Sequence, residues 1–355
     1  MTPIEKSVIG FAKQTAKCVT ASDNVPATET SYNYMLFTKG AISPTSTFTP
    51  LDQEVGGGAL VRDVMKTGVM SNGQLEFIPR PETLGHLLCS IMGADTSTLH
   101  ATATTSYDHV FKMATDQFSV PYYTWRSAPG YMWGEQFQDC RTTALALRWQ
   151  GANFLRGSIG ITGGLPKKIA TTGWTPTGSY LDTGPQFLAP ISAIELPTSS
   201  AVKCIEGAFT AAVAIPMDSQ WVVGSYTPDD FDITSRIFAI NRTLKITDAS
   251  LYTKMMYDYS ASGATASWAA DMLKEGSFKL NFKSNVMAEG LHPYELTIAA
   301  NGSSSNLGNV AWSVTPIGLR PGGQVVINAT GMFLADSTLP IAITLTNKHV
   351  AAYTA

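Results

Sequence analysis

The residues of this sequence that could carry chemistry are few and widely spread. His100 and His109, with Asp108 beside the latter, could supply metal ligands if a hairpin brought them together. No third partner is spaced to complete such a site. His109 also alternates with Tyr107 and Phe111 along an apparent strand, which indicates a structural histidine on one face of that strand. The favoured interpretation is therefore structural.

The acidic segment Asp229-Asp230-Phe231-Asp232 offers the closely spaced oxygen ligands that suit calcium. It lacks the Asp-x-Asp-x-Asp-Gly progression and the distal glutamate of a calcium loop, so a solvated loop is favoured, with a negatively charged wall as the alternative. Gly56-Gly57-Gly58 matches no phosphate-binding loop, and neither G-x-S-x-G nor H-E-x-x-H occurs. We therefore predict no catalytic, cofactor-binding or metal-binding residues and no enzyme activity.

Two aromatic segments, Tyr122–Arg126 and Tyr131–Trp133, could stack on bases or sugars. Because they lack surrounding basic residues, a place in the core or in a subunit contact is favoured. A carbohydrate-binding module remains an alternative. The cysteines stand singly, which indicates reduced structural thiols: Cys18, Cys89, Cys140 and Cys204.

Composition limits the class of protein. The chain has 355 residues, of which 44% are hydrophobic and 14% charged, and its formal net charge is −3. This composition is globular, and the length allows two domains. The charge balance lacks the basic footprint of a protein that grips nucleic acid. The apolar segment Gly207–Met217 is shorter than the about 20 residues that span a bilayer, so we expect no membrane insertion.

Most apolar residues recur at every second position between glycine, proline, asparagine or aspartate, which indicates many strands. One face of each strand is then buried and the other exposed. In Arg236–Ile246, Arg242 interrupts the apolar face. The pattern predicts the strands of a β-sandwich or barrel. The clearest alternating sets are Leu145, Leu147 and Trp149; Phe278, Leu280 and Phe282; and Ile341, Ile343 and Leu345.

One helix is clearly indicated. Leu84, Leu87, Leu88 and Ile91 follow the i, i+3, i+4, i+7 pattern. Pro81 suits the first turn, Gly93 suits the exit, and His86 would pack or cap. We assign Leu84, Leu87 and Leu88 to the core.

Two further local patterns predict a second helix and a turn, and both are weaker than the pattern of the first helix. A second helix is predicted to begin at Asp248 and to carry Leu251, Tyr252, Met255 and Met256. In the segment from Val69 to Ile78, Asn72-Gly73 predicts a tight hairpin turn.

The chain divides near residue 190. Between Pro166 and Pro197, glycine and proline break the alternation, which indicates a crossing between domains or a long surface excursion. Each half has strands, a helix and further strands in the same order, which hints at duplication. We therefore predict one module over residues 1–190, with an N-terminal arm and the crossing segment, and a second over residues 191–355.

Several short segments, taken in order, resemble the tail tube proteins of long-tailed, siphovirus-like bacteriophages. Each segment is weakly specific alone, and together they cover most of the chain. The segments are Gly58-Ala59-Leu60-Val61-Arg62, Gly68, Leu75-Glu76-Phe77, Pro81–Leu88, Met92-Gly93, Tyr107–Phe111, Arg242–Ile246 and Pro340–Asn347.

The resemblance implies a major tail protein, a structural virion subunit that forms stacked rings around a lumen. Double-stranded DNA would pass through this lumen into the bacterial host. It also implies two β-sandwich or barrel tube modules in tandem, each with a flanking helix, so that three copies would complete a ring of six modules. The implied partners are the chain itself, in trimeric rings that stack helically, and the tape-measure, tail-terminator and distal-tail proteins. The implied location is the virion tail, assembled in the host bacterial cytoplasm.

A tube of this kind sets physical requirements. Duplex DNA carries a negative charge about every 1.7 Å, so a basic wall would hold it. We therefore expect inward-facing Asp, Glu, Ser, Thr and Asn rather than clusters of Lys or Arg. Sheet edges of neighbouring copies should pair to close a β-barrel. The N-terminal arm and a polar loop from Ser43 to Gly58 are candidates for contact between rings. Other virion subunits, such as a capsid decoration or distal-tail protein, are the main alternative.

Overall fold

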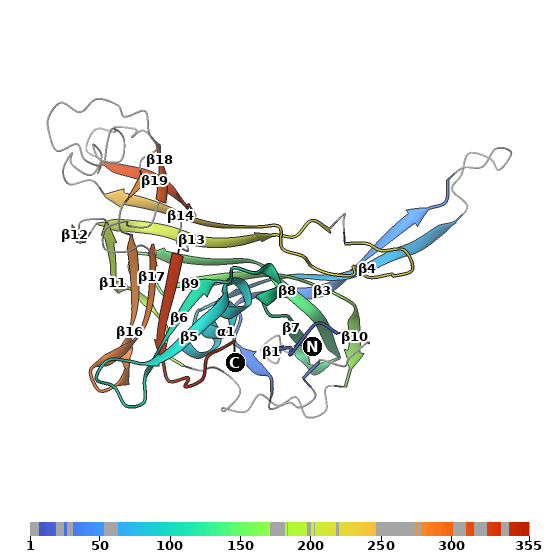
Figure 1. Cartoon of the computed structure of the whole chain (residues 1–355), viewed down its shortest axis with the longest axis horizontal. Helices are drawn as coiled ribbons and strands as arrows, with labels where there is room; N and C mark the ends of the chain where they lie inside the picture. Colours follow the sequence, from blue (N-terminus) through green and yellow to red (C-terminus); the bar gives the residue numbers. More distant parts are fainter. Residues whose placement is uncertain are drawn as a thin grey trace.

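The computed structural model shows two antiparallel β-sheets packed face to face, with a helix, α1 (Pro81–Met92), between them (Figure 1). The mainly β architecture confirms the predicted fold class. The structure describes residues 7–18, 25–26, 31–52, 63–170, 182, 184–196, 200–201, 203–217, 220–245, 274–275, 278–300, 310–315, 325–334 and 341–354.

The larger sheet has thirteen strands in the described part of the chain. Eight of them form one continuous run in the order β3-β4-β9-β8-β13-β14-β19-β18. The first part of the long strand β8 also pairs with β7 and β10, and β7 continues to β1 and β2. The strands are β1 (Val8–Lys13), β2 (Asn33–Met35), β3 (Lys39–Pro50), β4 (Val64–Phe77), β7 (Tyr123–Ala128), β8 (Gly134–Gln150), β9 (Arg156–Gly163), β10 (Pro166–Ile169), β13 (Cys204–Ala214), β14 (Ser235–Lys245), β15 (Lys274–Glu275), β18 (Val310–Thr315) and β19 (Val326–Phe333).

The smaller sheet has seven described strands in the order β12-β11-β16-β17-β20-β6-β5. It joins strands from both halves of the sequence, because β6 pairs with β20 from the C-terminal end. Its strands are β5 (Gly93–Leu99), β6 (Tyr107–Met113), β11 (Leu188–Leu196), β12 (Ser200–Ala201), β16 (Lys279–Glu289), β17 (His292–Ala300) and β20 (Ile341–Asn347). Two short 3-10 turns, Gln117–Ser119 and Pro129–Tyr131, flank β7.

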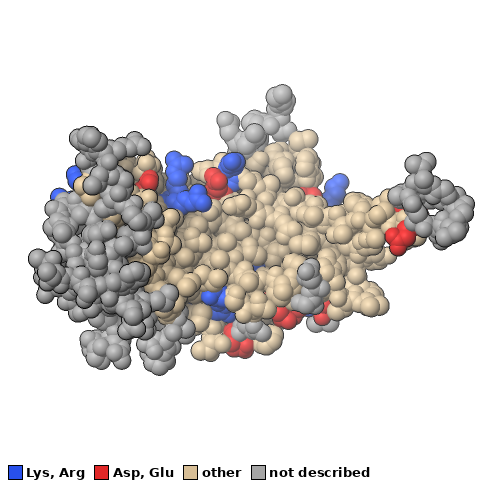
Figure 2. All heavy atoms as spheres, turned by 90° about the horizontal axis from the view of Figure 1, so that it is seen from above, with Lys and Arg blue, Asp and Glu red and all other residues tan. Residues whose placement is uncertain are grey.

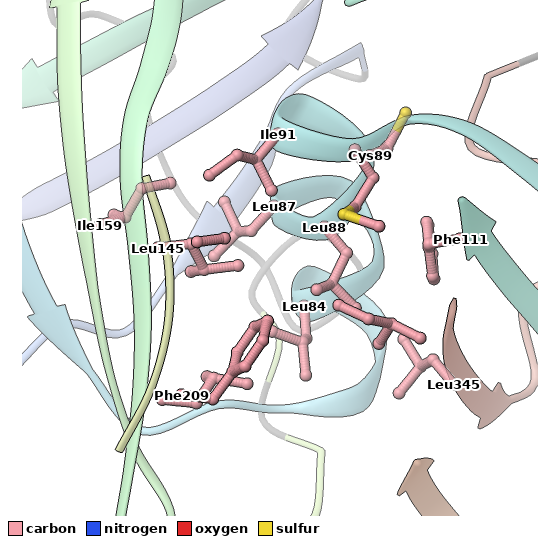
Figure 3. Close-up of a cluster of buried hydrophobic side chains, with 14 of the residues drawn as sticks. Leu84, Leu87, Leu88, Cys89, Ile91, Phe111, Leu145, Ile159, Phe209 and Leu345 are labelled. Carbon is pink, nitrogen blue, oxygen red and sulfur yellow. The ribbon is translucent and has the colours of Figure 1, made fainter. Parts of the chain in front are cut away.

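Helix α1 confirms the sequence prediction in its position, ends and buried face. Pro81 lies in the first turn, and Gly93 caps the last turn with a left-handed φ of 88°. The side chains of Leu84, Leu87 and Leu88 are at most 1% exposed. They lie between Leu145 and Ile159 of the larger sheet and Phe111 and Leu345 of the smaller one (Figure 3). The helix therefore fills the core between the sheets.

The predicted alternating faces are buried as expected. The alternating residues of β8, β16 and β20 named above are at most 5% exposed, and Phe278 just before β16 is 2% exposed. Arg242 is also fully buried, and its guanidinium lies 3.9 Å from the centre of the Trp312 ring. A cation stacked on an aromatic face explains how a charged side chain occupies an apolar position.

Two expectations about the first half are wrong. Asn72-Gly73 lies inside the continuous strand β4 rather than at a turn, because β4 pairs with β3 on one side and β9 on the other. A Cβ at Gly73 would lie 2.8 Å from the Ala41 carbonyl oxygen, so this glycine permits close approach of β3. In the loop predicted from Ser43 to Gly58, residues 43–50 belong instead to strand β3, and residues 53–58 lie outside the described residues.

Two further expectations concern the rest of the chain. The segment from Pro166 to Pro197 is not wholly irregular, because β10 and β11 form at its two ends. The helix predicted to begin at Asp248 lies outside the described residues.

The tips of two hairpins in the smaller sheet are joined by Glu289. Its carboxylate accepts hydrogen bonds from the backbone N–H groups of Thr104, Thr105 and Ser106 at 2.6 to 3.0 Å, and from the Thr104 hydroxyl. The rings of His100 and His292 meet beside it, with centroids 4.6 Å apart. This contact ties the β5–β6 loop to the β16–β17 turn.

Candidate functional site

The most extensive feature with functional potential is the outward side of the eight-strand run, which we call the polar face. It points away from α1 and the smaller sheet. Along β13, for example, Phe209 and Ala211 are buried in the core while Ala208, Thr210 and Ala212 alternate with them on the other side. The residues that share the polar face include Ser43, Thr45, Asn72, Gln74, Ser158, Ala144, Ala146, Ala208, Thr210, Ala212, Ala239, Asn241, Thr243, Asn328 and Thr330.

The ladder registers align these side chains into rows across the sheet. Ala146 lies opposite Thr210, which lies opposite Ala239. Small hydroxyl, amide and methyl groups therefore cover the middle of the polar face, with Ile237 and Met332 as exposed apolar exceptions. Such a surface offers weak hydrogen bonding and no net charge.

Charged side chains occupy the ends of the polar face. Lys39 and Glu76 are register partners on neighbouring strands, so their charges offset each other. Arg148 and Arg156 are also register partners, and with Glu206 they line a hollow of about 400 Å³. Figure 2, which looks onto this side, shows a broad uncharged area with the charged groups near its margins.

The eight-strand run ends in edges at β3 and β18. Among the described strands, β3 pairs with β4 alone, and it is exposed along most of its length. Strand β18 pairs with β19 on one side. On its other side, among the described residues, it pairs with β15 at Val310 and Ala311. Each edge presents backbone donors and acceptors that a further strand could pair with.

The hairpin of β3 and β4 projects beyond the body of the molecule (Figure 1). Near its described end four apolar side chains are between 47% and 62% exposed. They are Phe48, Leu51, Val64 and Met65. Exposed apolar side chains gathered at a projecting end suit contact with another protein surface.

The histidines considered as metal ligands are separated by the fold. Strands β5 and β6 form a hairpin, and His100 Nδ1 lies 2.8 Å from Asp108 Oδ2. His109 turns instead into the core, where its Nδ1 is 3.7 Å from Asp95 Oδ2. In the parts of the chain that the structure describes, no cluster of three or more His, Cys, Asp or Glu side chains could hold a metal ion.

Asp95 holds the C-terminal segment, a feature that the sequence did not indicate. Its carboxylate accepts hydrogen bonds from the backbone N–H groups of Tyr353 at 2.7 Å and Thr354 at 2.8 Å, and from the Thr354 hydroxyl at 2.6 Å. Burial opposes ionisation, but these bonds and the nearby His109 lower the pKa of Asp95 to about 2. His109 Nε2 lies 2.8 Å from the His349 carbonyl oxygen.

His86 packs as expected. Its ring meets Tyr353 edge-on at 4.7 Å between centroids, and burial, with the neighbouring His349, lowers the pKa of His86 to about 3. The imidazole is therefore neutral at physiological pH and serves as a packed ring of the core.

The acidic segment is used in structural contacts. Asp230 accepts a hydrogen bond from the Tyr122 hydroxyl, and Lys17 Nζ lies 3.7 Å from its carboxylate. Burial acts to raise the pKa of Asp230, but these contacts outweigh it and the pKa is lowered. Asp229 also lies near Lys17, at 3.9 Å. The segment therefore fastens the β13–β14 connection to the N-terminal region.

The aromatic segments do not form one exposed stacking surface. Tyr123 and Trp125 are each 2% exposed and belong to the core, as favoured from the sequence. Met132 and Trp133 are exposed at 66% and 41%.

Sequence reasoning missed the polar face. The segment from Gly207 to Ala214 reads as one uncharged apolar run, because alanine at alternate positions conceals the period of two. Side-chain size was the signal that could have revealed this alternation. The large side chains of Phe209 and Val213 face the core, whereas the small side chains of Ala208, Thr210 and Ala212 face outward.

Comparison with known proteins gives one informative result. A family model described as phage tail tube protein matches residues 5–320 of the chain. No curated protein matches it. Among the described helices, none is long and apolar enough to cross a bilayer.

Proposed function

The chain belongs to the phage tail tube protein family, and from this premise we propose that its copies join edge to edge into rings that stack into the tail tube. Its role is that of a structural component of the virion tail. In the proposed tube the polar face lines the bore, and double-stranded DNA passes along it into the host.

The observation that carries this proposal is the composition of the polar face together with the edges of the same sheet. Duplex DNA carries a negative charge about every 1.7 Å, so a wall of alanine, serine, threonine and asparagine binds it weakly and lets it slide. Arg148 and Arg156 depart from the expected inward-facing residue types, and they lie at one end of the face rather than across it.

Size also favours a ring of three chains. The eight-strand runs of three copies would supply twenty-four strands. With strands about 4.8 Å apart and tilted by about 40°, such a barrel has a backbone diameter of about 45–50 Å. Porins with 16–18 strands already enclose an aqueous channel. A barrel of this size therefore has room for a duplex.

We further propose two tube modules within the chain, as predicted for residues 1–190 and 191–355. Strand β11 (Leu188–Leu196) crosses that division, so we place the boundary of the second module just before Leu188. The N-terminal arm and the projecting β3–β4 hairpin would contact the next ring. The tape-measure, tail-terminator and distal-tail proteins remain proposed partners. The host bacterial cytoplasm is the proposed place of assembly.

Electron microscopy of the concentrated purified protein tests the proposal. We expect hollow tubes of repeating rings, each ring showing three chains and six similar modules around the axis. A persistent monomer, a closed shell, or a bore too narrow for duplex DNA would contradict it. A continuous positive surface along the bore would contradict the assignment of the polar face.

A further inference from the structure

The eight-strand run consists of two sets of four strands that share one order. The first set consists of β3, β4, β8 and β9, named in their order along the chain, and across the sheet these strands lie in the order β3-β4-β9-β8. In the second set, β13, β14, β18 and β19 lie in the order β13-β14-β19-β18. Each strand of the first set therefore has a counterpart at the same place in the second.

Glycines in the first strand of each set align the two sets residue by residue. A Cβ at Gly40 would lie 2.0 Å from the Gln74 carbonyl oxygen, and one at Gly207 would lie 2.6 Å from the Asn241 carbonyl oxygen. Both positions require glycine because the second strand of the hairpin approaches so closely. Gly40 thus corresponds to Gly207, and Gln74 to Asn241.

The neighbouring strands give the same alignment independently. Gln74 is the register partner of Gly160, and Asn241 is the register partner of Thr330. Gly160 and Thr330 occupy the same place in β9 and β19, which are both eight residues long. The two strands therefore correspond from end to end without any shift.

One joint between the sets is visible inside the chain. Strand β8 of the first set pairs antiparallel with β13 of the second, with Ala144 opposite Ala212. The counterpart of β8 is β18, and the counterpart of β13 is β3. These are the two edges of the run, and within one chain they lie at opposite ends of it.

Replacing each residue of the β8–β13 joint by its counterpart gives the register in which β18 and β3 would pair. Ala144 pairs with Gly160 and Ser313 pairs with Thr330, so Ser313 is the counterpart of Ala144. Ile237 and Met70 occupy equivalent positions, because each lies four residues before the matched pair Asn241 and Gln74. Ala212 pairs with Ile237, and Thr45 pairs with Met70. Thr45 is therefore the counterpart of Ala212.

We propose that β18 of one copy pairs antiparallel with β3 of a second copy of this chain, with Ser313 opposite Thr45. This inference rests on the proposed ring and specifies its contact between copies. Both side chains are small and exposed, as a close pair across a joint requires. Pro44 on this edge strand has no N–H to donate, and proline on an edge strand limits unspecific pairing of that edge.

Paired cysteines test the register. Directly opposite residues on antiparallel strands have Cα atoms about 4.5–5.5 Å apart, which suits a disulfide. In the double variant Ser313→Cys/Thr45→Cys, mild oxidation of assembled tubes should give covalent dimers and closed trimers on non-reducing gels, and reduction should release them. The single variants report any background from the native cysteines.

A matched control separates the register from mere proximity. The variant Ser313→Cys/Ala41→Cys places the second thiol on the same face of β3 but about 13 Å further along the strand, and it should remain uncrosslinked. Crosslinking through Ala41→Cys instead, or tubes that show no crosslink in either variant, would overturn the pairing while the proposed function stands. If neither the native chain nor the variants form tubes, the proposed function fails and the pairing with it.

Discussion

At the scale of single residues, Glu289 shows how one carboxylate can fasten two hairpins. Hydrogen bonds from the Thr104 hydroxyl and the N–H groups of Thr105 and Thr104 lower the pKa of Glu289 to about 2. A carboxyl with a lowered pKa stabilises the folded state above its unfolded pKa, which is near 4.5. That contribution is then lost as the pH falls toward 2.

We expect Glu289→Gln to lower the free energy of unfolding at neutral pH, because an amide accepts fewer and weaker hydrogen bonds from this loop. The difference between native protein and variant should shrink between about pH 4.5 and 2, where the native carboxyl becomes protonated. Urea unfolding across this range measures it. As a control, Glu76→Gln removes the same charge from an exposed side chain of strand β4. An equal pH profile for that control would show that the loop contacts are not responsible.

At the scale of elements, the C-terminal segment anchors helix α1. Tyr353 is 3% exposed and packs so closely on the helix that a Cβ at Gly85 would lie 2.1 Å from its ring. Asn347 donates hydrogen bonds to the Pro81 carbonyl oxygen at 3.0 Å and to the Tyr353 hydroxyl at 2.7 Å. The chain thereby fastens its last strand, β20, to a helix from the first half.

Replacing Tyr353 with alanine should destabilise the protein by about 3–5 kcal/mol, the range for truncating a large buried aromatic side chain. Tyr353→Phe keeps the ring and should cost only about 1 kcal/mol for the lost hydroxyl. Chemical denaturation gives both values. Hydrogen exchange should also accelerate in residues 347–354 and in α1 of the alanine variant, and exchange that stays unchanged there would refute the anchoring role.

The elements differ in how far the sequence predicts them. Helix α1 and strands such as β16 and β20 were predictable because each buries a periodic apolar face against the core. Asn72-Gly73 misled because the local turn preference was outweighed by pairing of β4 on both sides. The pairs β8–β13 and β6–β20 join residues distant in sequence, so no local pattern could reveal them. For the same reason, the polar face became visible only when the strands were placed side by side.

At the scale of the whole molecule, the proposed bore makes the charge of the polar face decisive. Thr210 lies between Ala146 and Ala239 in the middle of that face, so a lysine there has room beside small neighbours. Each ring of a Thr210→Lys tube would carry added positive charges at the same height, and stacked rings would repeat them along the bore. Contacts of this kind with phosphate depend on salt, because binding releases counterions.

We expect Thr210→Lys tubes to form normally but to retain short duplex DNA at low salt, with the binding constant falling more steeply with salt by about 0.9 in logarithmic slope per added phosphate contact. Sedimentation of tubes with labelled duplex measures this retention. Leu291→Lys adds the same charge at the exposed turn between β16 and β17, where the side chain is 90% exposed. Because that turn belongs to the other sheet, this control should retain no more DNA than the native tube. Equal retention by the two variants would place the polar face outside the DNA path.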